Sequence, residues 1–221
     1  MVRWQKVKDR LCFPLLAFLS SEHARSLRLT PIDEERVAIA LERCRGLVLD
    51  IGCGTNELAR GYRSRQGTAI GVDIYPWPGA DVVCDTTRLP FPAKHFDTVV
   101  MLACLNHVPQ SQRRRVLQEA RRVLKDEGHL LITMINPVVG FVVHAIRRRY
   151  DLDQLERGMT EEEAKGLWAK EVREFLAKSR FRLAETIPFV FGLNRLYISE
   201  KDKIGDLSGV EAIAPEGAQG L

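Results

Sequence analysis

The chain has 221 residues, of which 45% are hydrophobic and 28% are charged, and its formal net charge is +4 at pH 7. This length allows one α/β domain with additions, and the composition is that of an ordinary globular protein. The basic residues form only short runs, at 113–115 and 147–149, without interleaved aromatic residues, so nucleic acid is not expected as a partner. Five scattered cysteines show no metal-ligand spacing, which argues against a metal site and fits a reducing, cytoplasmic location.

Residues 1–45 are predicted to form a helical N-terminal extension. Residues 1–10 carry four basic side chains and precede an apolar stretch over 11–19. This pattern resembles the charged and apolar parts of a signal peptide, but the apolar stretch is too short to span a bilayer and no small-residue cleavage site is evident. A helix that covers the core or the ligand site is the favoured interpretation. An amphipathic segment lying on a membrane surface and a cleaved signal are the alternatives.

The middle of the chain alternates predicted helices and strands. A helix is expected to start at Thr30, which can cap it, with Pro31 at its first position. Another helix is expected over 56–65. The strands are expected at 47–51, 69–73, 81–84, 96–102 and 129–135.

Two connections between these strands have distinct patterns. Ser111 can cap a helix that Gly128 ends, because apolar residues recur between them at helical spacing. Between the second and third strands, Pro76, Pro78 and Gly79 break any helical period. A loop is therefore expected where a helix would normally connect two parallel strands.

The C-terminal part begins with residues 136–160, predicted to be an insert beside the ligand edge of the sheet. Residues 160–163 have the pattern of a capping box and are expected to open a helix. The apolar face of this helix is expected to contain Ala164, Leu167, Trp168, Val172, Phe175 and Leu176. Residues 181–190 and 195–200 alternate as a closing antiparallel hairpin, and residues 201–221 are expected to be a disordered tail.

The segment 48–55, with the sequence VLDIGCGT, is the most informative part of the chain. It has the pattern of a buried strand that runs into a tight glycine turn, where Gly52 and Gly54 allow a positive φ or a close approach of the backbone to a ligand. The next strand ends in Asp73, whose carboxylate can accept hydrogen bonds from both hydroxyls of a ribose. A strand, a glycine turn, a helix and a strand that ends in an acid form a nucleoside-binding βαβ unit.

The details of this unit separate possible ligands. A dinucleotide fingerprint needs a third glycine at the position of Glu57, so an NAD-dependent oxidoreductase is disfavoured. The chain also lacks the G-K-[ST] of a Walker phosphate loop. Asp50 would repel a pyrophosphate but suits a ligand with an ammonium or sulfonium group.

The segment 48–55 resembles motif I of the class I S-adenosylmethionine (SAM) dependent methyltransferases, of the methyltransferase type 11-like kind. The resemblance continues, over about residues 46–135, in CD at 84–85, LPFP at 89–92, FDTVVM at 96–101, LNHV at 105–108, RVLKDEG at 122–128 and HLLIT at 129–133. It implies a doubly wound, seven-stranded Rossmann-like sheet with helices on both faces and an antiparallel last strand. The methyltransferase domain would then occupy residues 46–200.

The resemblance also implies which residues bind SAM. Those expected around its methionine part are Asp50, Gly52, Cys53, Gly54, Thr55, Leu102 and Ala103. Asp73 is expected to hold the ribose and Ile74 to pack on adenine, while Asp85 would contact the adenine amino group, with Thr86 supplying backbone. His107 is the candidate catalytic base, and a structural role for it is the alternative. Asn56 departs from the family, which usually has glycine there, but asparagine tolerates left-handed backbone better than most residues.

The implied function is transfer of a methyl group from SAM to an oxygen or nitrogen atom of a small-molecule acceptor, leaving S-adenosylhomocysteine. Two apolar segments with basic neighbours, within 1–20 and 138–149, would suit a glycan- or lipid-linked acceptor and a peripheral contact with the inner membrane surface. They would equally suit a lid over a small acceptor. The alternative function is a non-enzymatic protein of this fold that binds a ligand or a partner.

Overall fold

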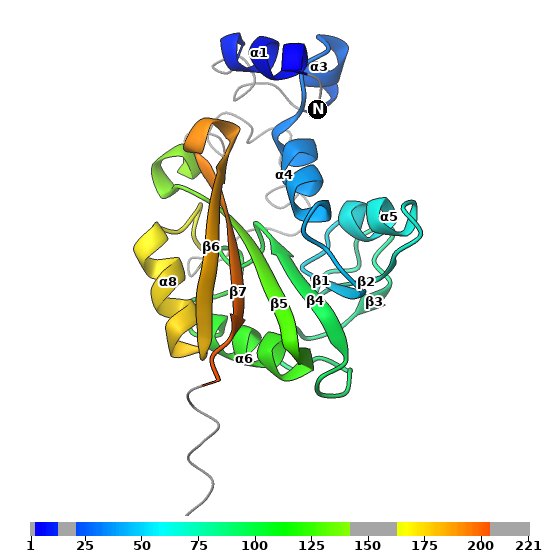
Figure 1. Cartoon of the computed structure of the whole chain (residues 1–221), viewed down its shortest axis with the longest axis vertical. Helices are drawn as coiled ribbons and strands as arrows, with labels where there is room; N and C mark the ends of the chain where they lie inside the picture. The colour runs from blue at the N-terminus through cyan, green and yellow to red at the C-terminus, as the bar shows by residue number, and fades with distance from the viewer. Residues whose placement is uncertain (1–2, 13–20, 142–162, 204–221) are drawn as a thin grey trace, which may run out of the picture.

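The computed structural model describes residues 3–12, 21–141 and 163–203, and its centre is a seven-stranded sheet with the order β3-β2-β1-β4-β5-β7-β6 (Figure 1). The strands are β1 (Leu47–Ile51), β2 (Thr68–Asp73), β3 (Val82–Val83), β4 (Phe96–Leu102), β5 (Leu124–Ile135), β6 (Phe181–Phe189) and β7 (Asn194–Lys201). The first five strands pair in parallel, and β7 runs antiparallel to both β5 and β6. The predicted sheet, with its antiparallel last strand, is confirmed.

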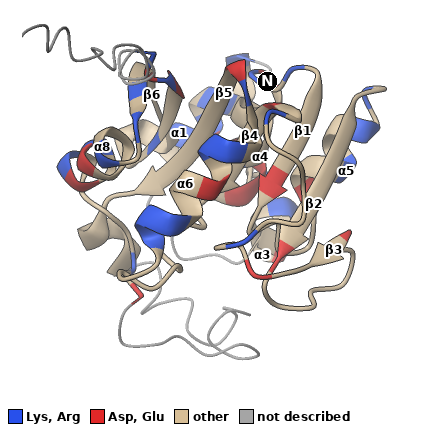
Figure 2. Ribbon diagram, turned by 90° about the horizontal axis from the view of Figure 1, so that it is seen from below, with Lys and Arg blue, Asp and Glu red and all other residues tan. Residues whose placement is uncertain are grey.

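Helices cover both faces of the sheet. α4 (Ile32–Leu41) and α5 (Glu57–Arg63) pack on one face, and α6 (Arg113–Val123) and α8 (Ala169–Lys178) pack on the other. Successive strand residues point to opposite faces and are fully buried on each, as in Val48, Val100 and Leu131 on the first face and Leu49, Val99 and Leu130 on the second. Burial on both sides explains the continuous apolar runs of these parallel strands. Charged residues lie mainly on the helices and at the strand ends (Figure 2).

The N-terminal helices α1 (Arg3–Leu11) and α3 (Ser21–Ser26) lie beyond the end of the sheet where β5 finishes, at the top of Figure 1. Thr30 does not cap α4 as predicted. The N-cap position is Pro31, which makes no side-chain hydrogen bond, and the Thr30 hydroxyl instead accepts a hydrogen bond from Gln5 Nε2 at 3.3 Å. The predicted domain boundary between residues 45 and 46 stays a prediction. α4, which lies before this boundary, contributes to the hydrophobic core on one face of the sheet.

The connection between α6 and β5 differs from the prediction. The N-cap position of α6 is Gln112, whose side chain makes no capping hydrogen bond. The predicted cap at Ser111 is therefore wrong. The helix ends at Val123 and not at Gly128, and β5 starts at once at Leu124. Leu124 is fully buried and pairs with Phe96, so the strand contact outweighs the helical pattern of the preceding residues.

The start of α8 is also later than predicted. Residues 163–168 are not helical, and the capping residue of α8 is Trp168, whose backbone N–H donates to Glu171 at 2.7 Å. Ala164 and Leu167 therefore lie before the helix, where their backbone N–H groups donate to Asn106 and Ile135. Tertiary hydrogen bonds take precedence here over the local capping signal.

The closing hairpin is confirmed by β6 and β7, and the loop predicted over 74–80 contains no helix. Residues 142–160 of the predicted insert, and residues 204–221 of the predicted tail, lie outside the described residues. No helix in the described part of the chain is long and apolar enough to cross a membrane.

Candidate cofactor site

The turn between β1 and α5 forms one wall of the site. Gly52, Gly54 and Asn56 have φ values of 70°, 52° and 63°, a left-handed conformation that glycine adopts easily and asparagine tolerates. A Cβ atom at Gly52 would collide with the side chain of Cys104, whereas one at Gly54 would meet no heavy atom within 4 Å. The turn is therefore packed against the exit of β4 at Gly52 and open at Gly54.

Two buried carboxylates lie where β1 and β2 reach this turn. Asp50 is 2% exposed, and its Oδ1 has no hydrogen-bond partner in the described part of the chain. Burial, and then the charge of Asp73, raise the pKa of Asp50 to about 8. Asp73 is 7% exposed and accepts hydrogen bonds from the backbone N–H groups of Gly54 and Tyr75, both at 3.0 Å. A buried acceptor without a partner is unfavourable, so Asp50 marks a place for a donor or a cation from a ligand.

Asn56, the departure from the family pattern, ties the turn to the loop after β2. Its side chain is completely buried, and Nδ2 donates to the carbonyl of Gly79 at 2.7 Å and to Asp81 at 3.0 Å. Partial burial would raise the pKa of Asp81, but hydrogen bonds from Arg63, Gly71 and Asn56 outweigh it and lower that pKa. Sequence reasoning missed this tether, although an asparagine at a glycine position beside a helix-free loop was its signal.

The loop 74–80 supplies the apolar side of the site. The rings of Tyr75 and Trp77 lie 4.6 Å apart, and Trp77 is buried, so these two side chains stabilise the loop itself. Ile74 directly follows Asp73 and is 60% exposed. The surface of Ile74, which is predicted to pack on adenine, is therefore available to a ligand ring.

Asp85 lies farther out, after the short strand β3. It is exposed, and its two carboxylate oxygens accept hydrogen bonds from the backbone N–H and the hydroxyl of Thr87, at 2.8 and 2.9 Å. These bonds lower the pKa of Asp85. The predicted adenine contacts of Asp85 and of Thr86 stay predictions, since this geometry also serves a local turn.

The exit of β4 brings the remaining predicted residues to the same edge of the sheet. Leu102 ends the strand, and Ala103 adopts a φ of 49° while its N–H donates to Thr133 Oγ1 at 3.0 Å. His107 follows, with Nδ1 3.3 Å from Glu163 Oε2. Sequence reasoning missed Glu163 because it placed this residue in a helix cap. The ends of β1, β2 and β4 thus bring Asp50, Asp73 and Leu102 together, as expected for adjacent parallel strands.

Cys53 and Thr55 complete the turn. Burial raises the pKa of the Cys53 thiol, which makes it a neutral, weakly polar part of the wall. No group of His, Cys, Asp and Glu side chains within the described ranges could hold a metal ion.

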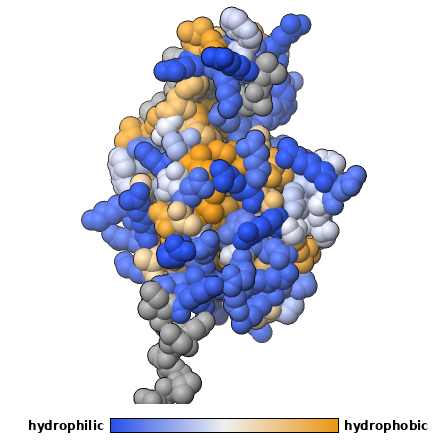
Figure 3. All heavy atoms as spheres, in the orientation of Figure 1, coloured by the Kyte–Doolittle hydropathy of each residue, from blue (hydrophilic) through white to orange (hydrophobic). Residues whose placement is uncertain are grey.

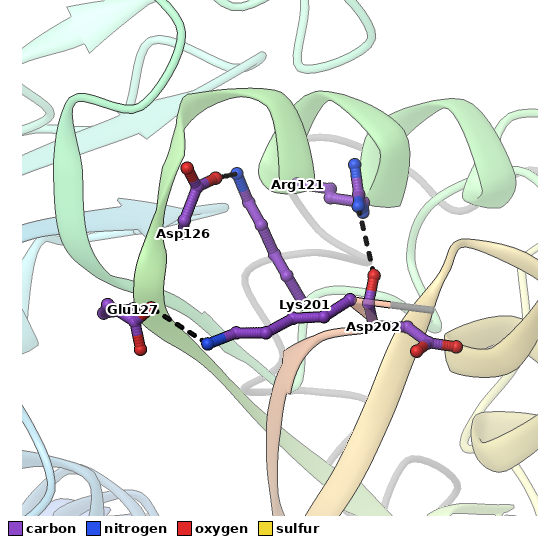
Figure 4. Close-up of a pocket in the computed structure, with 6 residues that line it drawn as sticks. Arg121, Asp126, Glu127, Lys201 and Asp202 are labelled. Carbon is purple, nitrogen blue, oxygen red and sulfur yellow. Dashed lines mark hydrogen bonds and ion pairs between the residues drawn. The ribbon is translucent and has the colours of Figure 1, made fainter. Parts of the chain in front are cut away.

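A hollow of 270 Å³ lies at the opposite edge of the sheet, where β5 begins and β7 ends (Figure 4). It is lined by Arg121, Asp126, Glu127, Lys201, Asp202 and Lys203. Lys201 pairs with Asp126 at 3.2 Å and Lys203 with Glu127 at 2.9 Å. Because these acidic and basic side chains neutralise one another, the lining of the hollow does not favour a charged ligand.

Residues 49–132 match the model of a protein family described as a methyltransferase domain. Residues 49–132 therefore carry a methyltransferase domain, and their match together with the fold is consistent with the class I SAM-dependent family. The match spans β1 to β5 and so includes all three strand ends that meet at the candidate site. The cofactor of this family is SAM.

Curated relatives match this methyltransferase domain over part of their length. The ubiquinone/menaquinone biosynthesis C-methyltransferase of Bordetella parapertussis is 36% identical over 102 residues, which are 38% of this chain and 39% of that protein. The probable tRNA methyltransferase 9B of Bos taurus is 35% identical over 95 residues, which are 39% of this chain and 20% of that protein. The chain thus matches at most about two fifths of the length of these relatives.

Solved methyltransferase structures share the fold. The 1,6-didemethyltoxoflavin-N1-methyltransferase of Burkholderia thailandensis, solved with 1,6-didemethyltoxoflavin and S-adenosylhomocysteine, has a TM-score of 0.56 and 17% identity over 76% of each chain. At this level of identity the likeness concerns the fold alone.

The site of this methyltransferase domain fits SAM in two respects. The partnerless Oδ1 of Asp50 offers an acceptor to the positively charged end of the cofactor, whose charge would favour the ionised carboxylate. The open space at Gly54 and the exposed side chain of Ile74 leave room for the rest of the molecule. Asn56, a departure from the family pattern, hydrogen-bonds the glycine turn to the helix-free loop and its flank at Gly79 and Asp81.

Proposed function

We propose that this protein is a SAM-dependent methyltransferase. The observation that carries the proposal is Asp50, a fully buried carboxylate with an unpaired oxygen beneath an open glycine turn. Burial makes ionisation of this carboxylate unfavourable in the unliganded protein, and a cationic ligand would favour the ionised form. When bound, SAM supplies an electrophilic methyl group on a sulfonium.

Different residues of the site bind different parts of SAM. Asp50 and the turn at Gly54 take the methionine part. Asp73 takes the ribose, because each carboxylate oxygen can accept more than the single backbone hydrogen bond that it already has. Ile74 packs on the adenine, and Asp85 contacts its amino group. These side chains align the methyl group with the acceptor and exclude water from the reaction.

The acceptor is proposed to be a small molecule that is methylated on oxygen or nitrogen, with a glycan- or lipid-linked molecule included. The modest net charge of +4 supports this choice over nucleic acid. One relative is named for quinone biosynthesis and carbon methylation, and another for tRNA, so carbon acceptors and tRNA are arms of the test.

The test incubates the purified protein with methyl-labelled SAM and, separately, with phenols and hydroquinones, a lipid extract and bulk tRNA. Label on an oxygen or nitrogen atom of a phenol, hydroquinone or lipid product supports the proposal, whereas label on a carbon atom would overturn the proposed acceptor atom. Label only in tRNA would overturn the proposed acceptor class. Binding of SAM without transfer to any acceptor would favour the non-enzymatic alternative. The Asp73→Asn variant controls for cofactor dependence.

We also propose that α1 contacts a membrane surface peripherally. Trp4, Val7 and Leu11 are 80%, 45% and 79% exposed and recur at helical spacing, so they share one face of the helix. Hydrophobic side chains are visible at the end of the molecule where α1 lies (Figure 3). The neighbouring basic residues, among them Lys6 and Arg10, suit anionic headgroups.

Sedimentation with vesicles tests this contact. Vesicles rich in phosphatidylglycerol are expected to bind the protein more strongly than phosphatidylcholine vesicles, and added salt is expected to weaken the binding. A Trp4→Ser, Leu11→Ser variant should lose binding, while Val83→Ser, at an exposed apolar residue on another element, should retain it. Equal behaviour of the two variants would contradict the contact.

A further inference from the structure

A histidine and a buried carboxylate meet at the exit of β4. His107 Nδ1 lies 3.3 Å from Glu163 Oε2, although the two residues are 56 positions apart. The side chain of Glu163 is 1% exposed and that of His107 is 18% exposed. A carboxylate is almost never buried to this extent without compensating hydrogen bonds, so the fold has to hold the pair together.

The backbone on both sides of the pair is fixed by buried hydrogen bonds. Asn106, next to His107, exchanges two hydrogen bonds with Ala164, next to Glu163: the Ala164 N–H donates to the Asn106 carbonyl at 2.9 Å, and Asn106 Nδ2 donates to the Ala164 carbonyl at 3.0 Å. Arg113, itself 3% exposed, donates to the carbonyls of Asn106 and Val108. The two side chains are therefore presented to each other by anchored backbone segments.

The chemistry of the contact determines the form of the imidazole. An ionised carboxylate can only accept hydrogen bonds, so His107 Nδ1 has to carry the hydrogen. In a neutral imidazole the lone pair then lies on Nε2, which is the arrangement of a general base. A carboxylate behind the ring also stabilises the imidazolium that forms when the base takes a proton.

We propose that Glu163 is a positioning residue that holds His107 as the general base of the methyl transfer. The proposal rests on the proposed methyltransferase function. The acceptor atom loses one proton for the methyl group that it gains, and this proton goes to His107 Nε2. Glu163 does not touch the acceptor; it fixes the tautomer and orientation of the ring that does.

Side-chain NMR of the 15N-labelled full-length protein tests the proposal without knowledge of the acceptor. Spectra are recorded at slightly alkaline pH, where imidazoles are neutral, and the His107 signals are assigned with His107→Gln. Wild type is expected to show Nδ1 protonated and Nε2 unprotonated. Glu163→Gln is expected to shift the balance toward the Nε2–H tautomer, because an amide can donate to Nδ1 as well as accept from it. Glu174→Gln, on the exposed flank of α8, should leave the His107 signals unchanged.

Catalysis and cofactor binding provide the second readout. With an acceptor from the labelling screen, Glu163→Gln is expected to lower kcat at least about tenfold, with the Kd for SAM unchanged and partial rescue by Glu163→Asp. An Nε2–H tautomer in wild type, or a tautomer indifferent to Glu163→Gln, would overturn the inference. Failure of the wild type to bind SAM would instead overturn the proposed function, so the two failures are distinguishable.

Discussion

At the scale of single residues, ionisation of the buried Asp50 lowers the stability of the unliganded protein, and the same carboxylate is proposed to bind the cationic part of SAM. Its raised pKa means that the folded protein binds a proton more tightly than the unfolded chain does. Between the ordinary value of 3.8 and about 8, the folded state therefore holds more protons, and stability falls as the pH rises through this window. A cation bound beside Asp50 reverses the penalty, because it favours the ionised form.

Asp50→Asn should therefore separate stability from binding. Near pH 8 the variant removes the buried charge, and without ligand it is expected to melt at least about 3 °C above wild type, with the difference vanishing toward pH 4. The same variant should bind SAM more weakly. Thermal unfolding over a pH series, with and without SAM, measures both effects. If the melting temperatures of the wild type and the variant changed with pH in parallel, ionisation of Asp50 would not destabilise the folded protein.

Asn56 is the second residue whose role can be isolated. Asn56→Gly preserves the left-handed backbone but removes the hydrogen bonds to Gly79 and Asp81, with an expected loss of about 1–3 kcal/mol. Faster amide exchange over 74–81 and weaker SAM binding should accompany the loss. Gln66→Gly is a matched control, because Gln66 has a φ of 64° but is exposed. If both variants unfolded at the same denaturant concentration, the tether would be unimportant.

At the scale of elements, the sequence predicts strands better than helix ends. Strand β1 and strand β4 occupy the predicted residues because their buried runs are continuous and bounded by turns. Helix limits depend on contacts that no local pattern contains. Leu124 leaves α6 to pair with Phe96, and the Asn106–Ala164 hydrogen bonds hold residues 163–168 out of α8.

The observed start of α8 gives a prediction at this scale. Glu171 caps the helix through the Trp168 N–H, so Glu171→Ala is expected to destabilise the protein by about 1 kcal/mol in urea unfolding. The neighbouring Lys170→Ala, at an exposed position, should change the free energy of unfolding by less than about 0.5 kcal/mol. A similar loss in both variants would argue against the capping role of Glu171.

At the scale of the whole molecule, the carboxyl ends of β1, β2 and β4 meet at one edge, and the N-terminal helices lie beyond the same end of the sheet (Figure 1). The sequence predicts the part of the site that comes from consecutive strand ends, namely Asp50, Gly54, Asp73 and Ile74. It does not predict the Asn56–Asp81 or His107–Glu163 contacts, which join residues 25 and 56 positions apart. Such pairs depend on the path of the loops in space.

Calorimetric titration of the wild-type protein with SAM and with S-adenosylhomocysteine tests the central claim most directly. We expect both ligands to bind with a Kd on the order of micromolar, Asp73→Asn to bind at least about tenfold more weakly, and Glu185→Gln, an exposed carboxyl of β6, to bind like wild type. A folded wild type that binds neither ligand would contradict the claim that this site holds SAM.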